Sequence, residues 1–157
     1  MTSPSALSEL SPQGCTHAKL RQLTRRVGQH FDAEVAQSGL KTTQYSLLTT
    51  IEARGPVRPV DLAASLHMTA STLSRNLHVL VDAGWLRIGD GPDARSRLVS
   101  ITEAGSAQRR AARVHWRRAQ QSLVALLGAD RVAALHALVE ESLPLLAPAP
   151  DEGLDAH

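Results

Sequence analysis

Apolar residues recur at steps of three and four along most of this chain, the spacing that places them on one face of an α-helix. Such stripes predict a first helix over about residues 15–38 and two later helices over about 103–127 and 130–142. The stripe of the helix at 103–127 should include Ala107, Ala111 and Val114. Gly39 stands where the first helix should end, and Pro144 should limit the extension of the last one. The pattern therefore predicts a mainly α-helical protein.

Two shorter helices are expected close together in the middle of the chain. The first should begin at Pro59, and the second should span about residues 69–83, with Thr69 as its N-cap. Only His67 and Met68 remain for the turn between them, although glycine would bend more easily there. Two helices joined by so short a turn form a helix-turn-helix.

The second of these helices has two contrasting faces. Apolar side chains at helical spacing should face a core, and they are Ala70, Leu73, Leu77 and Leu80. Short hydroxyls and cations occupy the other side, and such groups hydrogen-bond phosphates and base edges in a DNA major groove. The candidate DNA contacts on this helix are therefore Thr69, Ser71, Thr72, Ser74, Arg75 and His78. The alternative is an ordinary solvated helix surface.

The period changes from helix to strand after this helix. Residues 85–88 and 97–101 are strand-forming runs, and the segment between them consists of loop residues, which predicts a β-hairpin with a long tip. Arg95 and Arg97 lie at or beside the tip, where they could meet the negative potential of a minor groove or pair with Asp90 or Asp93. Asp93 could hold Arg95 in an extended pose. A helix-turn-helix followed by such a wing is a winged helix, here over about residues 42–102.

Several segments carry a resemblance to a known family. They are residues 39–48, residues 55–63, residues 68–75, Leu80 with Gly84, and the wing sequence Asp-Ala-Arg-Ser-Arg at 93–97 that runs into Ile-Thr-Glu-Ala-Gly at 101–105. Together they resemble the MarR-type (multiple antibiotic resistance regulator) winged-helix transcription factors over about residues 15–146. The resemblance implies one domain, double-stranded DNA as partner, and a homodimer formed by the helices at 15–38 and 103–146.

The stripes on the terminal helices favour a dimer independently. Leu20, Leu23, Val27 and Phe31 line one face of the first helix, and a winged helix alone is too small to cover this face and those of the last two helices. An intertwined two-fold dimer would bury them, whereas a self-contained bundle is the alternative. Two recognition helices about 34 Å apart would then require a pseudo-palindromic target.

Charge and composition indicate what kind of partner the protein binds and where in the cell it is located. Of the 15 acidic residues four lie in the tails at 1–14 and 147–157, while all 17 Lys and Arg lie between them, so residues 15–146 carry a formal +6. This balance favours a polyanionic partner. Both tails, the second rich in Pro and acids, should be poorly ordered. The absence of a signal sequence or a membrane-length apolar run, with a single Cys, predicts a cytoplasmic protein that makes no membrane contact.

The signal that releases DNA is less clear from the sequence. The resemblance implies a repressor released by a small ligand, often phenolic or an aromatic carboxylate, bound between the dimer helices and the winged helix. The candidate effector contacts are Cys15, His17, Arg21 and His30. Alternatively, Cys15 at a helix N-terminus could sense oxidants. Related sensors support their reactive Cys with two tyrosines, however, and the matching positions here hold Phe31 and Thr42. An inert packed thiol is the third interpretation.

Catalysis is not expected. The chain lacks a Gly-x-Ser-x-Gly elbow, a phosphate-binding loop and any paired metal-ligand motif, so we predict neither an enzyme nor a bound cofactor or metal. Trp116 is expected to pack in the core. An arginine-rich ridge on the helix at 103–127 is expected to be a solvated face, with flanking phosphate contact as the alternative, and its members are Arg109, Arg110, Arg113, Arg117 and Arg118.

Overall fold

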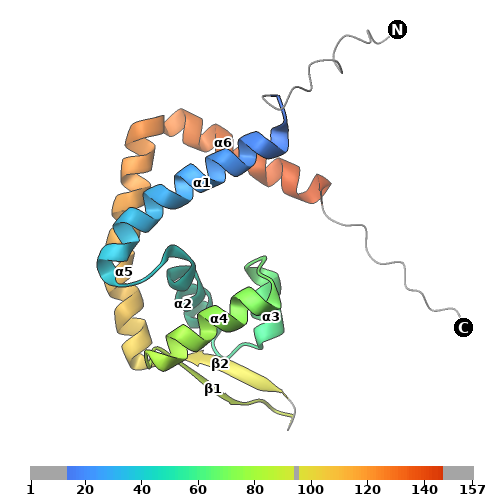
Figure 1. Cartoon of the computed structure of the whole chain (residues 1–157), viewed down its shortest axis with the longest axis vertical. Coiled ribbons are helices and arrows are strands. Elements are labelled where there is room, and N and C mark those ends of the chain that lie inside the picture. The colour runs from blue at the N-terminus through green and yellow to red at the C-terminus, as the bar shows by residue number, and fades with distance from the viewer. Residues whose placement is uncertain (1–13, 94–95, 147–157) are drawn as a thin grey trace, which may run out of the picture. The chain divides into compact units, whose positions relative to one another are not determined.

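The computed structural model describes residues 14–93 and 96–146, which fall into two compact units meeting at residue 120 (Figure 1). The first unit contains α1 (Thr16–Val35), a 3-10 turn (Ala36–Ser38), α2 (Thr42–Arg54), α3 (Pro59–Ser65), α4 (Ala70–Asp82), β1 (Leu86–Asp90), β2 (Arg97–Ile101) and most of α5 (Glu103–Leu127). The second contains the end of α5 and α6 (Ala129–Leu145). The predicted mainly α fold with a small β-hairpin is confirmed.

The core of the first unit lies among α2, α3, α4 and the hairpin, which pack together to form a winged helix (Figure 1). Its fully buried side chains include Leu47, Leu48, Ile51, Leu62, Leu80 and Val99. Burying an aliphatic side chain of this size contributes about 1.5–3 kcal/mol. This core holds α4 in place from behind and leaves its other face open.

Three helix boundaries differ from the sequence-based expectation. The first helix stops at Val35, and the chain continues as a 3-10 turn to Gly39, which has the expected left-handed φ of 82°. Pro144 lies inside α6, which runs on to Leu145, because a proline near a helix end removes one hydrogen bond without forcing the chain to leave the helix. The last helix was expected to begin at about residue 130, but α6 begins at Ala129.

The hairpin is longer than expected at its outer end. Strands β1 and β2 pair antiparallel from Leu86 opposite Ile101 to Asp90 opposite Arg97. Gly89 and Asp90 were expected in the loop, yet their backbones pair with the second strand. Val57 extends this small sheet through a bridge to Val99, with N···O distances of 3.0 and 2.9 Å. The wing is therefore fixed to the segment that precedes α3.

The motif at 101–105 forms a tight joint between α4 and α5. The hydroxyl of Thr102 donates to the carbonyl of Gly84 at 2.7 Å and accepts from the N–H of Gly105 at 3.0 Å. The N–H of Thr102 also donates to the carbonyl of Trp85 at 3.1 Å. A Cβ on Gly105 would lie only 2.1 Å from that carbonyl oxygen. Glycine is therefore required where α5 begins.

The buried stripe of α5 is not the one expected from its sequence. Ala107, Ala111 and Val114 are exposed, whereas the buried residues are Gly105, Ala112 and Ala119. Because alanine is frequent all around this helix, several stripes look alike in the sequence, and the partner surface selects among them.

Several large apolar side chains on the terminal helices are exposed within a single chain. On α1 these are Leu20, 52% exposed, and Leu23, 37% exposed. On α6 they are Leu138, Val139, Leu143 and Leu145. Among the described residues no single helix is long and apolar enough to cross a membrane, although α5 and α6 together meet that composition.

Candidate nucleic-acid interface

The polar face of α4 is open to solvent. All six candidate DNA contacts on this helix are exposed, namely Thr69, Ser71, Thr72, Ser74, Arg75 and His78. On the opposite face Leu73, Leu77 and Leu80 are buried as expected. Ala70 is the exception, since it is exposed rather than packed in the core. The buried face therefore anchors the helix in the core, and its hydroxyls and cations point to solvent.

Three hydroxyls cluster at the N-terminus of α4. Thr69 caps the helix, because its Oγ1 accepts from the N–H of Thr72 at 3.2 Å. The same hydroxyl lies 3.2 Å from the hydroxyl of Ser71 and donates to that of Thr72 at 2.9 Å. The positive end of the helix dipole and unpaired backbone N–H groups lie at this end. The cluster is thus well suited to a phosphate oxygen.

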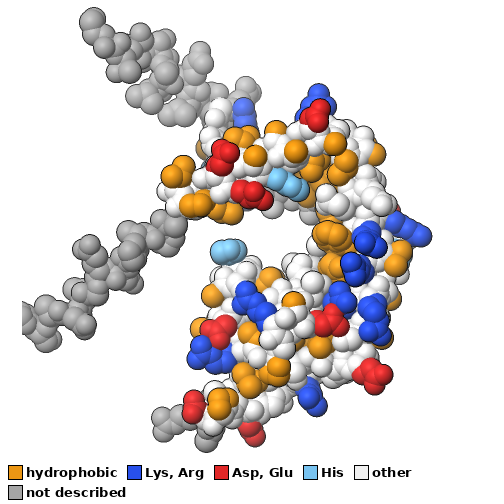
Figure 2. Space-filling view, turned by 180° about the vertical axis from the view of Figure 1, so that it is seen from behind, with side chains coloured by type: hydrophobic (Ala, Val, Ile, Leu, Met, Phe, Trp, Pro, Cys, Tyr) orange, Lys and Arg blue, Asp and Glu red, His pale blue; other side chains and the backbone are white. Residues whose placement is uncertain are grey.

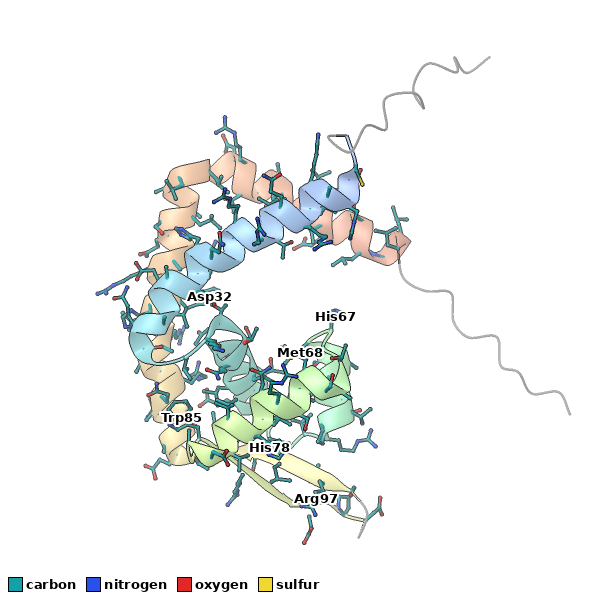
Figure 3. The ribbon with its side chains drawn as sticks, viewed as in Figure 1. Asp32, His67, Met68, His78, Trp85 and Arg97 are labelled. Atoms are coloured by element: carbon teal, nitrogen blue, oxygen red, sulfur yellow. The ribbon has the colours of Figure 1, made fainter. Side chains whose placement is uncertain are left out.

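The turn before α4 holds the hydroxyl cluster at its position. His67 adopts a left-handed conformation with φ 51°, and the N–H of Met68 donates to the carbonyl of Ala63 at 3.0 Å. Figure 3 shows both residues in the turn that joins α3 to α4. The expectation that a glycine-like conformation is needed here is therefore correct, and histidine adopts it.

The wing carries its cation beyond the helical body. Arg97 is exposed at the outer end of β2, and its backbone pairs with Asp90 (Figure 3). The carbonyl of Asp93 accepts from the N–H and the hydroxyl of Ser96 at 2.9 and 3.0 Å. Arg95 lies outside the described residues, so the expected Asp93–Arg95 contact stays a prediction.

Two cations near α4 escaped the sequence-based prediction. Arg87 lies on the exposed face of β1, where its Nε donates to the hydroxyl of Ser100 at 3.0 Å. Arg58 precedes α3 and donates to both carboxylate oxygens of Asp61 at 2.7 and 3.0 Å. This hydrogen bonding holds the pKa of Asp61 below its usual value. Both guanidinium groups are therefore already engaged.

One arginine of the predicted ridge on α5 is not solvated. Arg109 forms an ion pair with Glu52 of α2, and its side chain is only 16% exposed. The contact pairs residues far apart in the sequence, so helical periodicity could not reveal it. The remaining members of the ridge, Arg110, Arg113, Arg117 and Arg118, are exposed as expected. In the space-filling view Lys and Arg side chains gather along the edge that α5 forms (Figure 2).

Three aromatic residues of the first unit pack against one another. Trp116 stacks on Tyr45, with ring centroids 6.1 Å apart, and lies 6.0 Å from Phe31. This confirms the expectation that Trp116 has a packing role.

The four candidate effector contacts do not converge within one chain. Cys15 is the N-cap of α1, and His17 and Arg21 follow on its exposed first turns, where they line a shallow hollow of about 290 Å³. His30 lies about 20 Å from His17 along the axis of α1. Its Nε2 donates to the carbonyl of Ala119 on α5 at 3.0 Å. A shared role for all four therefore stays a prediction.

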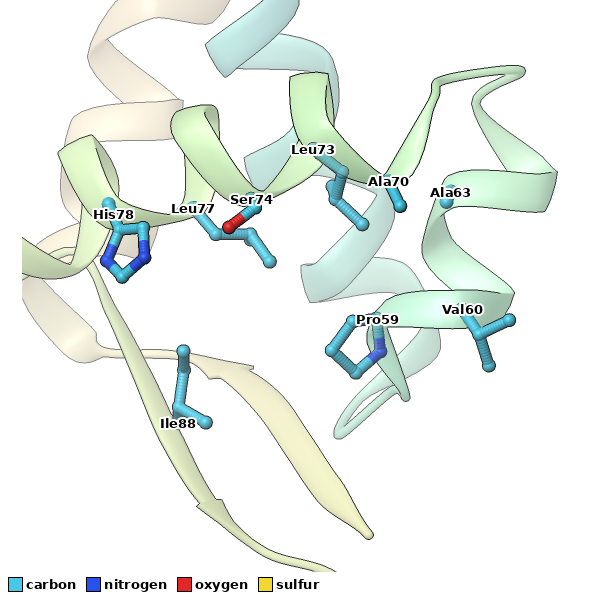
Figure 4. Close-up of a pocket in the computed structure, with 9 residues that line it drawn as sticks. All are labelled: Pro59, Val60, Ala63, Ala70, Leu73, Ser74, Leu77, His78 and Ile88. Atoms are coloured by element: carbon cyan, nitrogen blue, oxygen red, sulfur yellow. The ribbon is translucent and has the colours of Figure 1, made fainter.

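An apolar pocket of about 320 Å³ lies beside α4 (Figure 4). Helix α3, helix α4 and strand β1 form its walls, and its lining residues are Pro59, Val60, Ala63, Ala70, Leu73, Ser74, Leu77, His78 and Ile88. Ala70, which does not reach the core, faces this space. Within the described ranges no group of three or more His, Cys, Asp or Glu residues could hold a metal ion.

Comparison with known proteins shows which family has a similar sequence. The model of the MarR family matches residues 38–96. The multiple antibiotic resistance protein MarR of Salmonella typhimurium is 34% identical over 109 residues, which are 67% of this chain and 74% of the relative.

Solved structures agree with the sequence match. A cysteine-to-serine mutant of MarR from E. coli complexed with operator DNA superposes with a TM-score of 0.76 at 26% identity, covering 88% of this chain and 99% of that one. The transcriptional regulator MosR of M. tuberculosis in complex with DNA gives 0.70 at 31% identity, covering 83% and 97%. With its winged helix, the open polar face of α4 and these relatives, the chain belongs to the MarR family of DNA-binding transcriptional regulators.

Proposed function

We propose that the protein is a cytoplasmic, homodimeric repressor that binds a pseudo-palindromic operator in double-stranded DNA and is released by a small molecule. The observation that carries the proposal is the open face of α4, where the hydroxyl cluster of Thr69, Ser71 and Thr72 lies near Arg75 above a packed core. The relatives solved with DNA support the same use of the fold.

Base recognition is assigned to α4 and backbone attachment to the wing. Arg75 can donate two hydrogen bonds to a guanine edge, and Ser71 can bond either a base or a phosphate. Arg97, near the wing tip, suits the narrow minor groove. Phosphate contacts set the position of a protein on DNA, whereas base contacts select the sequence.

The exposed apolar residues on α1 and α6 support dimerisation. Soluble proteins seldom leave several large apolar side chains of one helix uncovered, and a second copy would bury them. A two-fold dimer would present two α4 helices to successive major grooves about 34 Å apart. A ligand that favours another separation would lower the affinity for the operator.

Sensing by Cys15 has less support. Its side chain makes no capping hydrogen bond to α1. The two positions that hold tyrosines in related sensors are occupied by Phe31, which is buried, and by Thr42, whose hydroxyl donates to Asp32 at 2.6 Å. Release by a small molecule is therefore the function proposed here.

Replacing Leu20 and Leu23 with Asp should convert the protein to monomers and weaken operator binding by about a hundredfold or more, because the two half-sites would no longer be bound together. Light scattering after gel filtration gives the mass, and fluorescence anisotropy gives the affinity. Val60→Asp, at a still more exposed apolar residue on α3, should remain dimeric. A double variant that is still dimeric, or a wild-type protein that is monomeric, would overturn the proposed assembly.

A further inference from the structure

Glu52 and Arg109 form an ion pair that is largely withdrawn from water. The side chain of Arg109 is 16% exposed and that of Glu52 is 29% exposed, and the pair joins α5 to α2. Withdrawing two charges from water costs free energy that their mutual attraction only roughly offsets, so such a pair contributes little to stability. Because the attraction is strong only at close range, the pair instead restricts how α2 can lie on α5.

The pair lies at the end of α2 that leads into the helix-turn-helix. Glu52 belongs to the last turn of α2, which ends at Arg54, and α3 follows at Pro59. Trp116 stacks on Tyr45 about 10 Å further along α5. One pair of stacked rings leaves two helices free to turn about it, whereas a second attachment at Glu52 prevents that rotation.

The residue next to Arg109 attaches α5 to the end of α1. The Nε2 of Gln108 donates to the carbonyl of Ser38 at 2.5 Å, in the 3-10 turn that follows α1. Further along α5, the carbonyl of Ala119 accepts from His30 of α1 at 3.0 Å. Helix α5 is therefore attached both to α1 with its turn and, through Arg109, to α2.

These contacts connect the exposed leucines of α1 to the polar face of α4. Helix α2 shares a buried core with α4, in which Ile51 and Leu80 are fully buried. Figure 1 shows α2 between α5 and α4. A change in the angle between α2 and α5 would therefore move α4 relative to Leu20 and Leu23 of α1. In a dimer held together by these leucines, such a change would alter the separation of the two α4 helices.

We propose that the ion pair between Glu52 and Arg109 holds α4 at a fixed position relative to α1, and thereby sets the separation of half-sites that the protein accepts. The inference rests on the proposed function and adds to it, because residues of α4 select the bases whereas this pair selects the distance between the two half-sites. Both are positioning residues. Glu52 would repel phosphates, and the guanidinium group of Arg109 is already engaged.

Replacing both residues with Met tests this role without leaving an unpaired charge. Apolar residues in place of a buried ion pair often leave stability unchanged or higher, so Glu52→Met/Arg109→Met should fold, while its flexible side chains no longer fix the angle. Anisotropy titrations use a two-site duplex selected from a random pool with the wild-type protein, and the same duplex with two base pairs inserted between its half-sites. The insertion should weaken wild-type binding about tenfold or more, but binding of the Met pair by less than about threefold.

Charge reversal provides a second test. Arg109→Glu and Glu52→Arg each place like charges together, so each should weaken binding to the two-site duplex about tenfold while changing binding to a duplex with one half-site by less than about threefold. Combining them restores opposite charges and should recover most of the lost affinity. Arg110→Glu, the same change at the adjacent exposed residue, is the matched control and should affect both duplexes alike. Circular dichroism verifies folding, and the two double variants decide the question if a single reversal unfolds.

The inference and the proposed function can fail separately. A Met pair with the wild-type response to the insertion, single reversals that weaken binding to both duplexes equally, or a combined reversal that recovers no affinity would each overturn the role of the ion pair. In those cases the wild type would still prefer the two-site duplex. A wild-type protein that binds one half-site as tightly as two would overturn the proposed function, and the inference with it.

Discussion

Gly105→Ala should lower the free energy of unfolding by about 2 kcal/mol or more, although Ala normally stabilises a helix relative to Gly. The added Cβ would lie 2.1 Å from the carbonyl oxygen of Trp85 and 2.9 Å from Cγ1 of Ile101. That carbonyl accepts from the N–H of Thr102, so it cannot turn away without breaking the joint between α4 and α5. The clash can be relieved only if α5 shifts away from α4.

Chemical denaturation followed by circular dichroism measures this effect. The matched control is Gly28→Ala, within α1, because a Cβ at Gly28 would meet no atom within 4 Å. That variant should raise stability by about 0.5–1 kcal/mol. If Gly105→Ala proves as stable as the wild type, the close approach of Trp85 to α5 is incorrect.

Arg75→Ala should weaken operator binding by about 10- to 100-fold and relax the preference at the base pair that Arg75 contacts. Arg75 is exposed on the open face of α4, near the hydroxyl cluster that would position the helix on the phosphates. Ser71→Ala should act in the same direction with a smaller effect. Arg95→Ala, in contrast, should weaken binding to all sequences alike.

Anisotropy titrations against the operator and against single-base variants of it separate these outcomes. Arg117→Ala provides the control, because Arg117 is an exposed arginine of α5 outside the winged helix. Equal loss for Arg117→Ala and Arg75→Ala would indicate general charge attraction in place of recognition by α4. Unchanged affinity of Arg75→Ala would remove α4 from the base-reading role.

Helical periodicity predicted the parts of the fold in which polar and apolar residues occupy clearly separate faces of a helix. On α4, Leu73, Leu77 and Leu80 are buried and the side opposite them is open. It failed on α5, where alanine is so frequent that the stripe facing the core has no distinct composition. The outer end of the hairpin was also missed, because the pairing of Gly89 and Asp90 depends on backbone register.

The candidate site divides in the same way. Exposed residues of one helix could be predicted together because they share a face. The pocket could not, since it combines Val60 and Ile88 from elements far apart in the sequence with residues of α4. The ion pair of Glu52 with Arg109 was hidden for the same reason. His30 was grouped with residues at the start of α1, yet it bonds to α5.

The proposed function requires two copies of α4 to contact successive major grooves. Its most direct test begins with selection of bound duplexes from a random pool, followed by insertion of about half a helical turn between the half-sites. We expect a two-fold-related sequence bound by two chains, with affinity reduced about a hundredfold by the insertion. Binding that is indifferent to the insertion, or one chain on each duplex, would contradict it.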